Sequence, residues 1–240
     1  MKVLILGGTG EARALASALS GAGHQPTTAL AGRTSAIDAL AGAVHIGAFG
    51  GAEGLSNYLK SEGFERLVDA THPYAAQISG NAVAAAELCG IALVRLVRPC
   101  WEPADGDAWV RVADIAEASH MLPANANVLL TTGHRGLEQF AERSDCSFTA
   151  RLIEPSDVSP PEHMKVLLSR PPHAYESECA LLQRLGATHL VTKNAGGRQT
   201  AQKLVAARDL GVEVVMIERP VLAAADEVED VAAVLAWMGR

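Results

Sequence analysis

Residues 69–75 read Asp-Ala-Thr-His-Pro-Tyr-Ala and follow directly after the apolar pair Leu67-Val68. The segment contains four side chains that can exchange protons or hydrogen bonds, namely Asp69, Thr71, His72 and Tyr74. In open α/β sheets, ligands bind beyond the carboxyl ends of the strands, so polar groups at such a strand end indicate a site. Pro73 is suited to begin the next helix, because its fixed φ angle matches the first helical position. We therefore expect Thr71 and His72 to contact a ligand and Asp69 to be structural.

A glycine-rich turn joins the apolar run at residues 3–6 to an Ala- and Leu-rich segment. In this context small residues let the backbone approach a pyrophosphate, and the helix N-terminus offers N–H groups and a positive dipole end. The match to a dinucleotide fingerprint is incomplete, since the pattern is Gly-x-Thr-x-x-Ala, and a merely tight turn is the alternative. Glu11 is unusual in such a turn because a carboxylate repels phosphate, although it could cap its own helix or hold a ribose hydroxyl. The expected cofactor contacts in this turn are Gly7, Gly8, Thr9, Gly10 and Glu11.

The end of the second expected strand indicates which nucleotide would bind. A site for NAD would place Asp or Glu here, where it holds the ribose 2′-hydroxyl. The chain has Arg33 and Thr34 instead. A guanidinium and a hydroxyl suit a 2′-phosphate, so we predict NADPH rather than NADH.

Two further strand ends combine glycine with cations and hydrogen-bonding groups. They are Thr131-Thr132-Gly133-His134-Arg135 and Lys193-Asn194-Ala195-Gly196-Gly197. Arg135, Lys193 and Arg198 could bind carboxylates or phosphates. A solvated loop is the alternative for each segment alone, but several such strand ends in one chain favour a shared site. Residues 170–173, Arg-Pro-Pro-His, are a weaker candidate of the same kind.

Apolar runs and Ala- and Leu-rich segments alternate along the chain, which indicates parallel sheets with helical crossovers. The expected strands cover residues 3–6, 27–30, 44–46, 67–70, 91–96, 128–132, 148–153, 166–169, 189–192 and 212–217. The expected helices cover residues 11–19, 55–62, 77–89, 114–122, 137–143, 175–185, 200–210 and 228–238. The polar, proline-containing stretch at residues 98–106 interrupts this alternation and is the expected linker. We predict an α/β fold of two consecutive Rossmann-like domains, residues 1–98 and 99–240, with the active-site cleft between them.

Composition excludes several classes of protein. The net charge of −7 arises after residue 98, since residues 1–98 carry seven Lys/Arg and seven Asp/Glu while residues 99–240 carry 13 and 20. This balance argues against nucleic-acid binding. No apolar run reaches the length of a membrane span, and strand 3–6 begins too early for a signal peptide, so we expect a cytoplasmic protein. The four cysteines are far apart and the eight histidines form no ligand motif, so no metal is expected.

Taken together, the motifs resemble those of the precorrin-6A reductase family of cobalamin biosynthesis. The resemblance rests on residues 4–12, 30–34, 50–55, 69–75, 131–137, 191–197, 203–211 and 215–220. The blocks at 69–75 and 191–197 are specific, and the set spans nearly the whole chain in order. The resemblance implies NADPH-dependent hydride transfer to a carbon–carbon double bond of precorrin-6A, which gives precorrin-6B. It also leaves room for a hand-off of the product to neighbouring enzymes of the pathway.

The resemblance also suggests roles for the residues. We assign His72, Tyr74 and Lys193 to catalysis, with His72 or Tyr74 or solvent as the source of the proton. Cofactor contacts then include Thr71, His72, Gly133 and Asn194 in addition to the glycine-rich turn and Arg33 and Thr34. The carboxylates of the substrate are assigned to Arg135, Lys193, Arg198 and Lys203. The alternatives are the cobalt-containing substrate, another NADPH reductase of a small conjugated substrate, and a non-catalytic NADP(H)-sensing protein.

Overall fold

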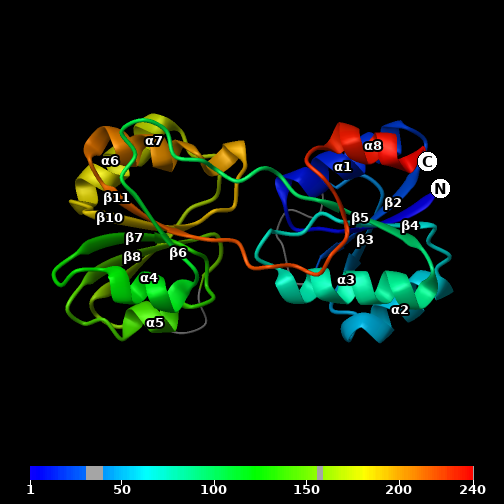
Figure 1. Ribbon diagram of the computed structural model, residues 1–240, viewed down its shortest axis with the longest axis horizontal. Helices are drawn as coiled ribbons and strands as arrows, with labels where there is room; N and C mark the ends of the chain where they lie inside the picture. Colours follow the sequence, from blue (N-terminus) through cyan, green and yellow to red (C-terminus); the bar gives the residue numbers. More distant parts are fainter. Residues whose placement is uncertain (31–39, 156–158, 240) are drawn as a thin grey trace. The chain divides into compact units, whose positions relative to one another are not determined.

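The computed structural model describes residues 1–30, 40–155 and 159–239, and the chain divides into two units. The first unit comprises Met1–Pro99 together with the segment from Pro220 onward, and the second comprises Cys100–Arg219. Each is a six-stranded sheet in which every described pair of strands is parallel, with helices on both faces (Figure 1). The fold is therefore α/β and Rossmann-like, as predicted.

The first sheet has the strand order β12-β5-β4-β1-β2-β3. Its strands are β1 (Lys2–Leu6), β2 (Gln25–Leu30), β3 (Ala43–Ile46), β4 (Arg66–Asp69), β5 (Ala92–Leu96) and β12 (Asp226–Val228). Read from the other edge, this is the doubly wound order in which the direction of winding reverses between β1 and β4. The loops after these two strands therefore mark the expected position of a ligand.

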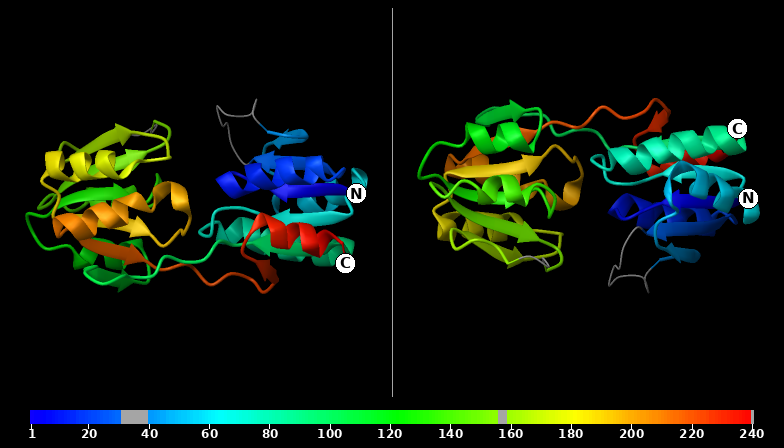
Figure 2. Two further views of the ribbon diagram at one scale, coloured as in Figure 1. Left: turned by 90° about the horizontal axis from the view of Figure 1, so that it is seen from above. Right: turned by 90° about the horizontal axis from the view of Figure 1, so that it is seen from below.

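Alternation along the central strands explains how this sheet is covered on both faces. Val3 and Ile5 pack on one face with the apolar sides of α1 (Gly10–Gly21) and α8 (Val231–Met238). Leu4 and Leu6 pack on the other face with α2 (Gly51–Ser61) and α3 (Ala76–Cys89). Helix α8 lies beside α1 although the two are at opposite ends of the sequence (Figure 2). Because both faces are covered at the centre of the sheet, β1 is a continuous apolar run from Val3 to Leu6.

The second sheet has the strand order β6-β11-β10-β7-β8-β9. Its strands are β6 (Trp109–Val112), β7 (Asn127–Thr131), β8 (Ser147–Leu152), β9 (Met164–Leu168), β10 (His189–Lys193) and β11 (Glu213–Ile217). Its helices are α4 (Ile115–Met121), α5 (Leu137–Ala141), α6 (Tyr175–Leu185) and α7 (Gln202–Leu210), with a 3-10 turn, η2, at Arg198–Thr200. Helices α6 and α7 cover one face and α4 and α5 the other (Figure 1). The winding reverses between β7 and β10, so their carboxyl ends are the equivalent position in this unit.

Three expectations need correction. The segment from Pro220 onward belongs to the first unit and not to the second, because β12 pairs with β5 and α8 packs on α1. Strands β6 and β12 were not predicted. Pro73 does not begin α3, which starts at Ala76; it lies in a turn closed by the hydrogen bond from Ala75 N to His72 O (2.8 Å).

Candidate functional site

The glycine-rich turn after β1 is built for close packing on one side and open on the other. A Cβ atom on Gly7 would lie 2.7 Å from Cγ2 of Thr28, so this position needs glycine for packing against β2. Gly8 has a φ of +110°, and a Cβ there would meet no described atom within 4 Å. The backbone at Gly8 is thus exposed for a ligand to approach, as a nucleotide-binding turn requires.

Thr9 ties this turn to the end of β4. Its Oγ1 accepts a hydrogen bond from Ala12 N (3.1 Å), which caps α1, and donates one to Ala70 O (2.8 Å). The two strand ends at which the winding reverses are therefore fixed to each other. The N-terminus of α1, with its positive dipole end, lies at this point.

Glu11 makes an ion pair in place of the repulsion that the sequence suggested. Nη1 of Arg98 donates to Glu11 Oε2 at 2.6 Å. The guanidinium offsets the carboxylate in the first turn of α1, which removes the objection to a phosphate at this helix N-terminus. The other predicted contacts with the nucleotide, Arg33 and Thr34, lie outside the described residues.

The segment after β4 forms a tight turn that presents His72. Asp69 Oδ1 accepts hydrogen bonds from both Thr71 N (3.1 Å) and Thr71 Oγ1 (2.7 Å). His72 is exposed, and its Nδ1 accepts from Tyr74 N at 3.3 Å, while the two rings lie 5.6 Å apart. An Nδ1 that accepts leaves Nε2 to carry the proton in the neutral ring. Asp69 holds the turn from within, as predicted, and the turn brings Thr71, His72 and Tyr74 together.

In the second unit, basic side chains gather at the carboxyl ends of the strands. Residues 100–219 carry 12 Lys/Arg against 16 Asp/Glu, so this gathering is not a result of overall composition. Lys193 ends β10, and its Nζ donates to Thr132 O at 2.6 Å. Burial, followed by the positive charge of Arg135, lowers the pKa of Lys193. Two predicted residues, Lys193 and Arg135, are thus close enough to influence each other.

Lys203 lies deeper than the sequence suggested. It is in the first turn of α7 and only 5% exposed, and its Nζ donates to Thr131 Oγ1 (3.1 Å) and lies 5.2 Å from the centre of the Trp101 ring. Burial, followed by the charge of Arg151, lowers the pKa of Lys203 to about 7, and Glu178 opposes this shift. Its ammonium therefore gives up its proton far more readily than a surface lysine does.

An ion pair that the sequence did not reveal lies beside Lys203. Arg151, near the end of β8, donates from Nη1 to Glu178 Oε1 at 2.5 Å, and both residues are buried. Burial, then the charges of Arg151 and Lys203, lowers the pKa of His173, with Glu178 acting in the opposite sense. His173 belongs to the weaker candidate at 170–173. The signal for Arg151 is a charged residue inside a strand that is otherwise uncharged.

The side chain of Asn194 is bonded within the protein. It is fully buried, its Oδ1 accepts from Trp101 N (2.8 Å), and its Nδ2 donates to Trp101 O (3.1 Å). Trp101 Nε1 also donates to Gly197 O at 3.2 Å. Asn194 therefore holds Trp101 over Lys203, and its predicted contact with a cofactor stays a prediction.

Two other predicted site residues lie in turns of the second unit. Arg198 is exposed in η2, and Gly133 has a φ of +79° in the turn before Arg135.

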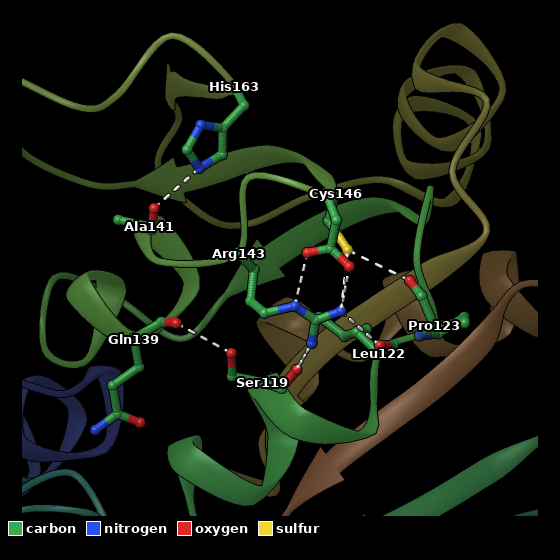
Figure 3. Close-up of polar contacts among 9 residues, drawn as sticks. Ser119, Leu122, Pro123, Gln139, Ala141, Arg143, Cys146 and His163 are labelled. Carbon is green, nitrogen blue, oxygen red and sulfur yellow. Dashed lines mark hydrogen bonds and ion pairs between the residues drawn. The ribbon is translucent and has the colours of Figure 1, made fainter.

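A separate polar cluster surrounds Arg143, between the end of α4 and the start of β8 (Figure 3). Arg143 donates to the carbonyls of Ser119 and Leu122 at the end of α4, and it pairs with Asp145 at 2.8 Å. The buried thiol of Cys146 contacts Pro123 O at 3.3 Å. These groups join the end of α4 to the start of β8, so their role is structural.

The described residues contain neither a metal-binding cluster nor a helix that could span a membrane. No group of three or more His, Cys, Asp or Glu side chains there has the arrangement of a metal site. None of the helices in the described ranges is both long enough and apolar enough to cross a lipid bilayer.

Comparisons with known proteins match the chain from end to end. The model of the family described as precorrin-6x reductase CbiJ/CobK matches residues 2–239. The chain is 47% identical to the precorrin-6A reductase of Rhodococcus erythropolis, over 99% of this chain and 97% of that protein. It is 39% identical to that of Rhodobacter capsulatus, over 99% and 95% of the two chains. It is 30% identical to the cobalt-precorrin-6A reductase of Priestia megaterium, over 91% and 90%.

A solved structure gives the same result for the fold. The structure of "CobK precorrin-6A reductase" superposes with a TM-score of 0.95 and 39% identity, over 100% of this chain and 96% of that one. The family model, the relatives and this structure all indicate the family that the motifs at 69–75 and 191–197 predicted. The chain belongs to the precorrin-6x reductase (CbiJ/CobK) family.

Proposed function

We propose that this protein reduces precorrin-6A to precorrin-6B with NADPH as the hydride donor. The observation that carries the proposal is the graded similarity to curated relatives. Relatives that act on precorrin-6A are 39–47% identical to the chain, whereas relatives that act on the cobalt-containing compound are 30–31% identical. This gradient favours the cobalt-free substrate over the alternative.

The first unit supplies the features that suit a dinucleotide. The open backbone at Gly8, the N-terminus of α1 and the Arg98 partner of Glu11 together fit a pyrophosphate. Arg33 and Thr34 follow β2, where a 2′-phosphate would distinguish NADPH from NADH. When bound, NADPH supplies the hydride that reduces a carbon–carbon double bond of the macrocycle. The protein residues bind and orient the reactants and provide the proton that accompanies the hydride.

The second unit supplies the features that suit a substrate rich in carboxylates. Arg135, Arg198 and Lys193 are accessible or half-buried cations at its carboxyl edge. Lys203 is buried against Trp101, and with a pKa of about 7 it carries its positive charge chiefly below neutral pH. Guanidinium and ammonium groups bind carboxylates by charge-assisted hydrogen bonds, so each is expected to hold one acidic side chain of the ring.

Three groups remain candidates for the proton donor. His72 and Tyr74 lie in the turn after β4, and the lowered pKa of Lys193 makes its ammonium a better acid than an ordinary lysine. His72→Gln, Tyr74→Phe and Lys193→Met each remove one donor. We expect the removal of the true donor to lower kcat by roughly a hundredfold or more, as for other general acids. Equal, small effects of all three changes would indicate that solvent supplies the proton.

The decisive experiment mixes the purified protein with precorrin-6A and either NADPH or NADH and follows nicotinamide absorbance. A parallel reaction contains cobalt-precorrin-6A. We expect rapid oxidation of NADPH with precorrin-6A and slower oxidation in the other three combinations. Binding of NADPH without oxidation by either substrate would contradict the proposal and favour a sensing role. Hand-off of the product is part of the same expectation, and a faster release of precorrin-6B on adding the next enzyme would support it.

A further inference from the structure

A row of charged side chains crosses three neighbouring strands at the carboxyl edge of the first sheet. Asp69 of β4 is in register with Arg95 of β5, and Arg95 is in register with Glu227 of β12. Arg95 Nε lies 3.3 Å from Asp69 Oδ2, and Arg95 Nη1 lies 2.8 Å from Glu227 Oε1. Nη2 of the same guanidinium donates to Ala223 O at 2.8 Å. Arg95 thus links the centre of the sheet to the C-terminal segment.

The pair formed by Asp69 and Arg95 is almost completely buried, at 1% and 3% exposure. A buried ion pair is a poor source of stability, because apolar residues of the same size often serve as well or better. Such a pair can instead fix one particular arrangement of the chain. The arrangement fixed here follows from the contacts of Asp69 Oδ1, the carboxylate oxygen that Arg95 does not hold.

That oxygen controls the turn that presents His72. Asp69 Oδ1 receives both the main-chain N–H and the hydroxyl of Thr71. With Oδ2 held by Arg95, the carboxylate cannot rotate without breaking these bonds. The hydroxyl of Thr71 therefore donates inward and keeps only its acceptor lone pairs for a ligand. The position and the polarity of the turn both depend on Arg95.

We propose that Arg95 is a positioning residue for the Thr71–His72 turn, and that Glu227 of the C-terminal strand holds Arg95 in place. This inference rests on the proposed function in one respect, namely that the turn faces the cofactor or the substrate. It means that a strand far along the sequence sets the geometry of the reaction without touching a reactant.

The test compares two changes in the same C-terminal segment. Glu227→Gln removes the charge that holds Arg95, at a side chain that is half exposed. Asp230→Ala is the matched control, because Asp230 caps α8 through Ala233 N (2.8 Å) and has no part in the charged row. Arg95→Lys is the stronger change, since a single compact ammonium cannot replace the planar guanidinium, whose Nε, Nη1 and Nη2 reach three separate partners.

The first measurement needs no ligand. The imidazole signals of His72 are assigned in the NMR spectrum by their loss in His72→Gln. We expect them to shift in Arg95→Lys and, less strongly, in Glu227→Gln, and to stay in place in Asp230→Ala. Unshifted His72 signals in both Arg95→Lys and Glu227→Gln would overturn the positioning role, whether or not the protein reduces precorrin-6A.

The second measurement is turnover of precorrin-6A. We expect kcat to fall about tenfold or more in Arg95→Lys, since a small misplacement of a positioned group has effects of this size or larger. In the double variant Thr71→Val/Glu227→Gln, the fold-decrease in kcat should be smaller than the product of the two single fold-decreases. The reason is that both changes act on the same chain of contacts through Asp69. Additive effects would contradict the proposed chain of contacts. Shifted His72 signals with unchanged kcat would overturn the role of the turn in the reaction, and an inactive wild type would contradict the proposed function alone.

Discussion

Lys203 gives a quantitative prediction for the dependence of stability on pH. In the folded protein its pKa is about 7, against 10.5 for an ordinary lysine, chiefly because the ammonium is buried. Between these two values the unfolded chain binds a proton that the folded chain has released. The free energy of unfolding therefore rises with pH over this interval. The destabilising effect of the charge is complete below pH 7 and disappears above pH 10.5.

The size of the effect follows from the same two pKa values. From pH 7 to pH 9, the contribution of Lys203 to the free energy of unfolding should rise by about 2 kcal/mol. Lys203→Met keeps a side chain of similar length without the titrating group, so this rise should be absent from the variant. Lys165→Met is the matched control, because Lys165 is an exposed lysine of the same unit.

Urea unfolding at the two pH values measures this difference. In a Trp237→Phe background the remaining tryptophans, Trp101 and Trp109, both report on the second unit. We expect wild type and Lys165→Met to gain stability with pH by an amount about 2 kcal/mol larger than that of Lys203→Met. If Lys203→Met gains as much as the wild type, the ammonium does not lose its proton near neutral pH, and the reasoning from burial fails.

Three other changes test separate features. Gly7→Ala places a Cβ 2.7 Å from Thr28 Cγ2 and should lower the free energy of unfolding by about 1–3 kcal/mol, measured by thermal unfolding. Thr28→Ser removes this methyl group and should relieve the effect. An unchanged stability of Gly7→Ala would show that β2 can move away. Arg143→Ala leaves two carbonyls at the end of α4 without their donor and should cost about 1–3 kcal/mol, and an unchanged melting temperature would show that water replaces the guanidinium. Arg33→Ala should raise KM for NADPH and not for NADH; an equal rise for both would contradict a role in binding the 2′-phosphate.

Most of the fold could be predicted because the central strands carry their own signal. Runs such as Val3–Leu6 are buried on both faces, and the segments between them have helical composition, so local sequence reveals both. Strand β12 was missed for the opposite reason. Asp226–Val228 is short, polar and largely exposed, and it is a strand only because it pairs with β5. Pairing between distant segments leaves no local pattern, and the domain assignment of the last residues failed with it.

The candidate site was predicted in part. Glycine-rich turns and strand-end motifs placed Thr9, Thr71 and Lys193 at the carboxyl edges of the sheets, because that position follows from the order of elements. The pairing of Arg151 with Glu178 was beyond prediction, since it joins a strand to a helix after an intervening strand. The hydrogen bonds between Asn194 and Trp101 could not be predicted either, because the two residues are 93 positions apart in the sequence.

The path of the chain through the two sheets has a consequence for biosynthesis. Residues 100–219 form a complete unit, but the first unit lacks β12 and α8 until the segment after Pro220 is made. Domains usually fold in the order of their synthesis. In this protein the second unit can finish first, while the nascent first unit waits with β5 as an open sheet edge, a position at which another chain could pair. Removal of residues 221–239 would thus take β12 and α8 from the N-terminal unit and leave β5 as an exposed edge strand.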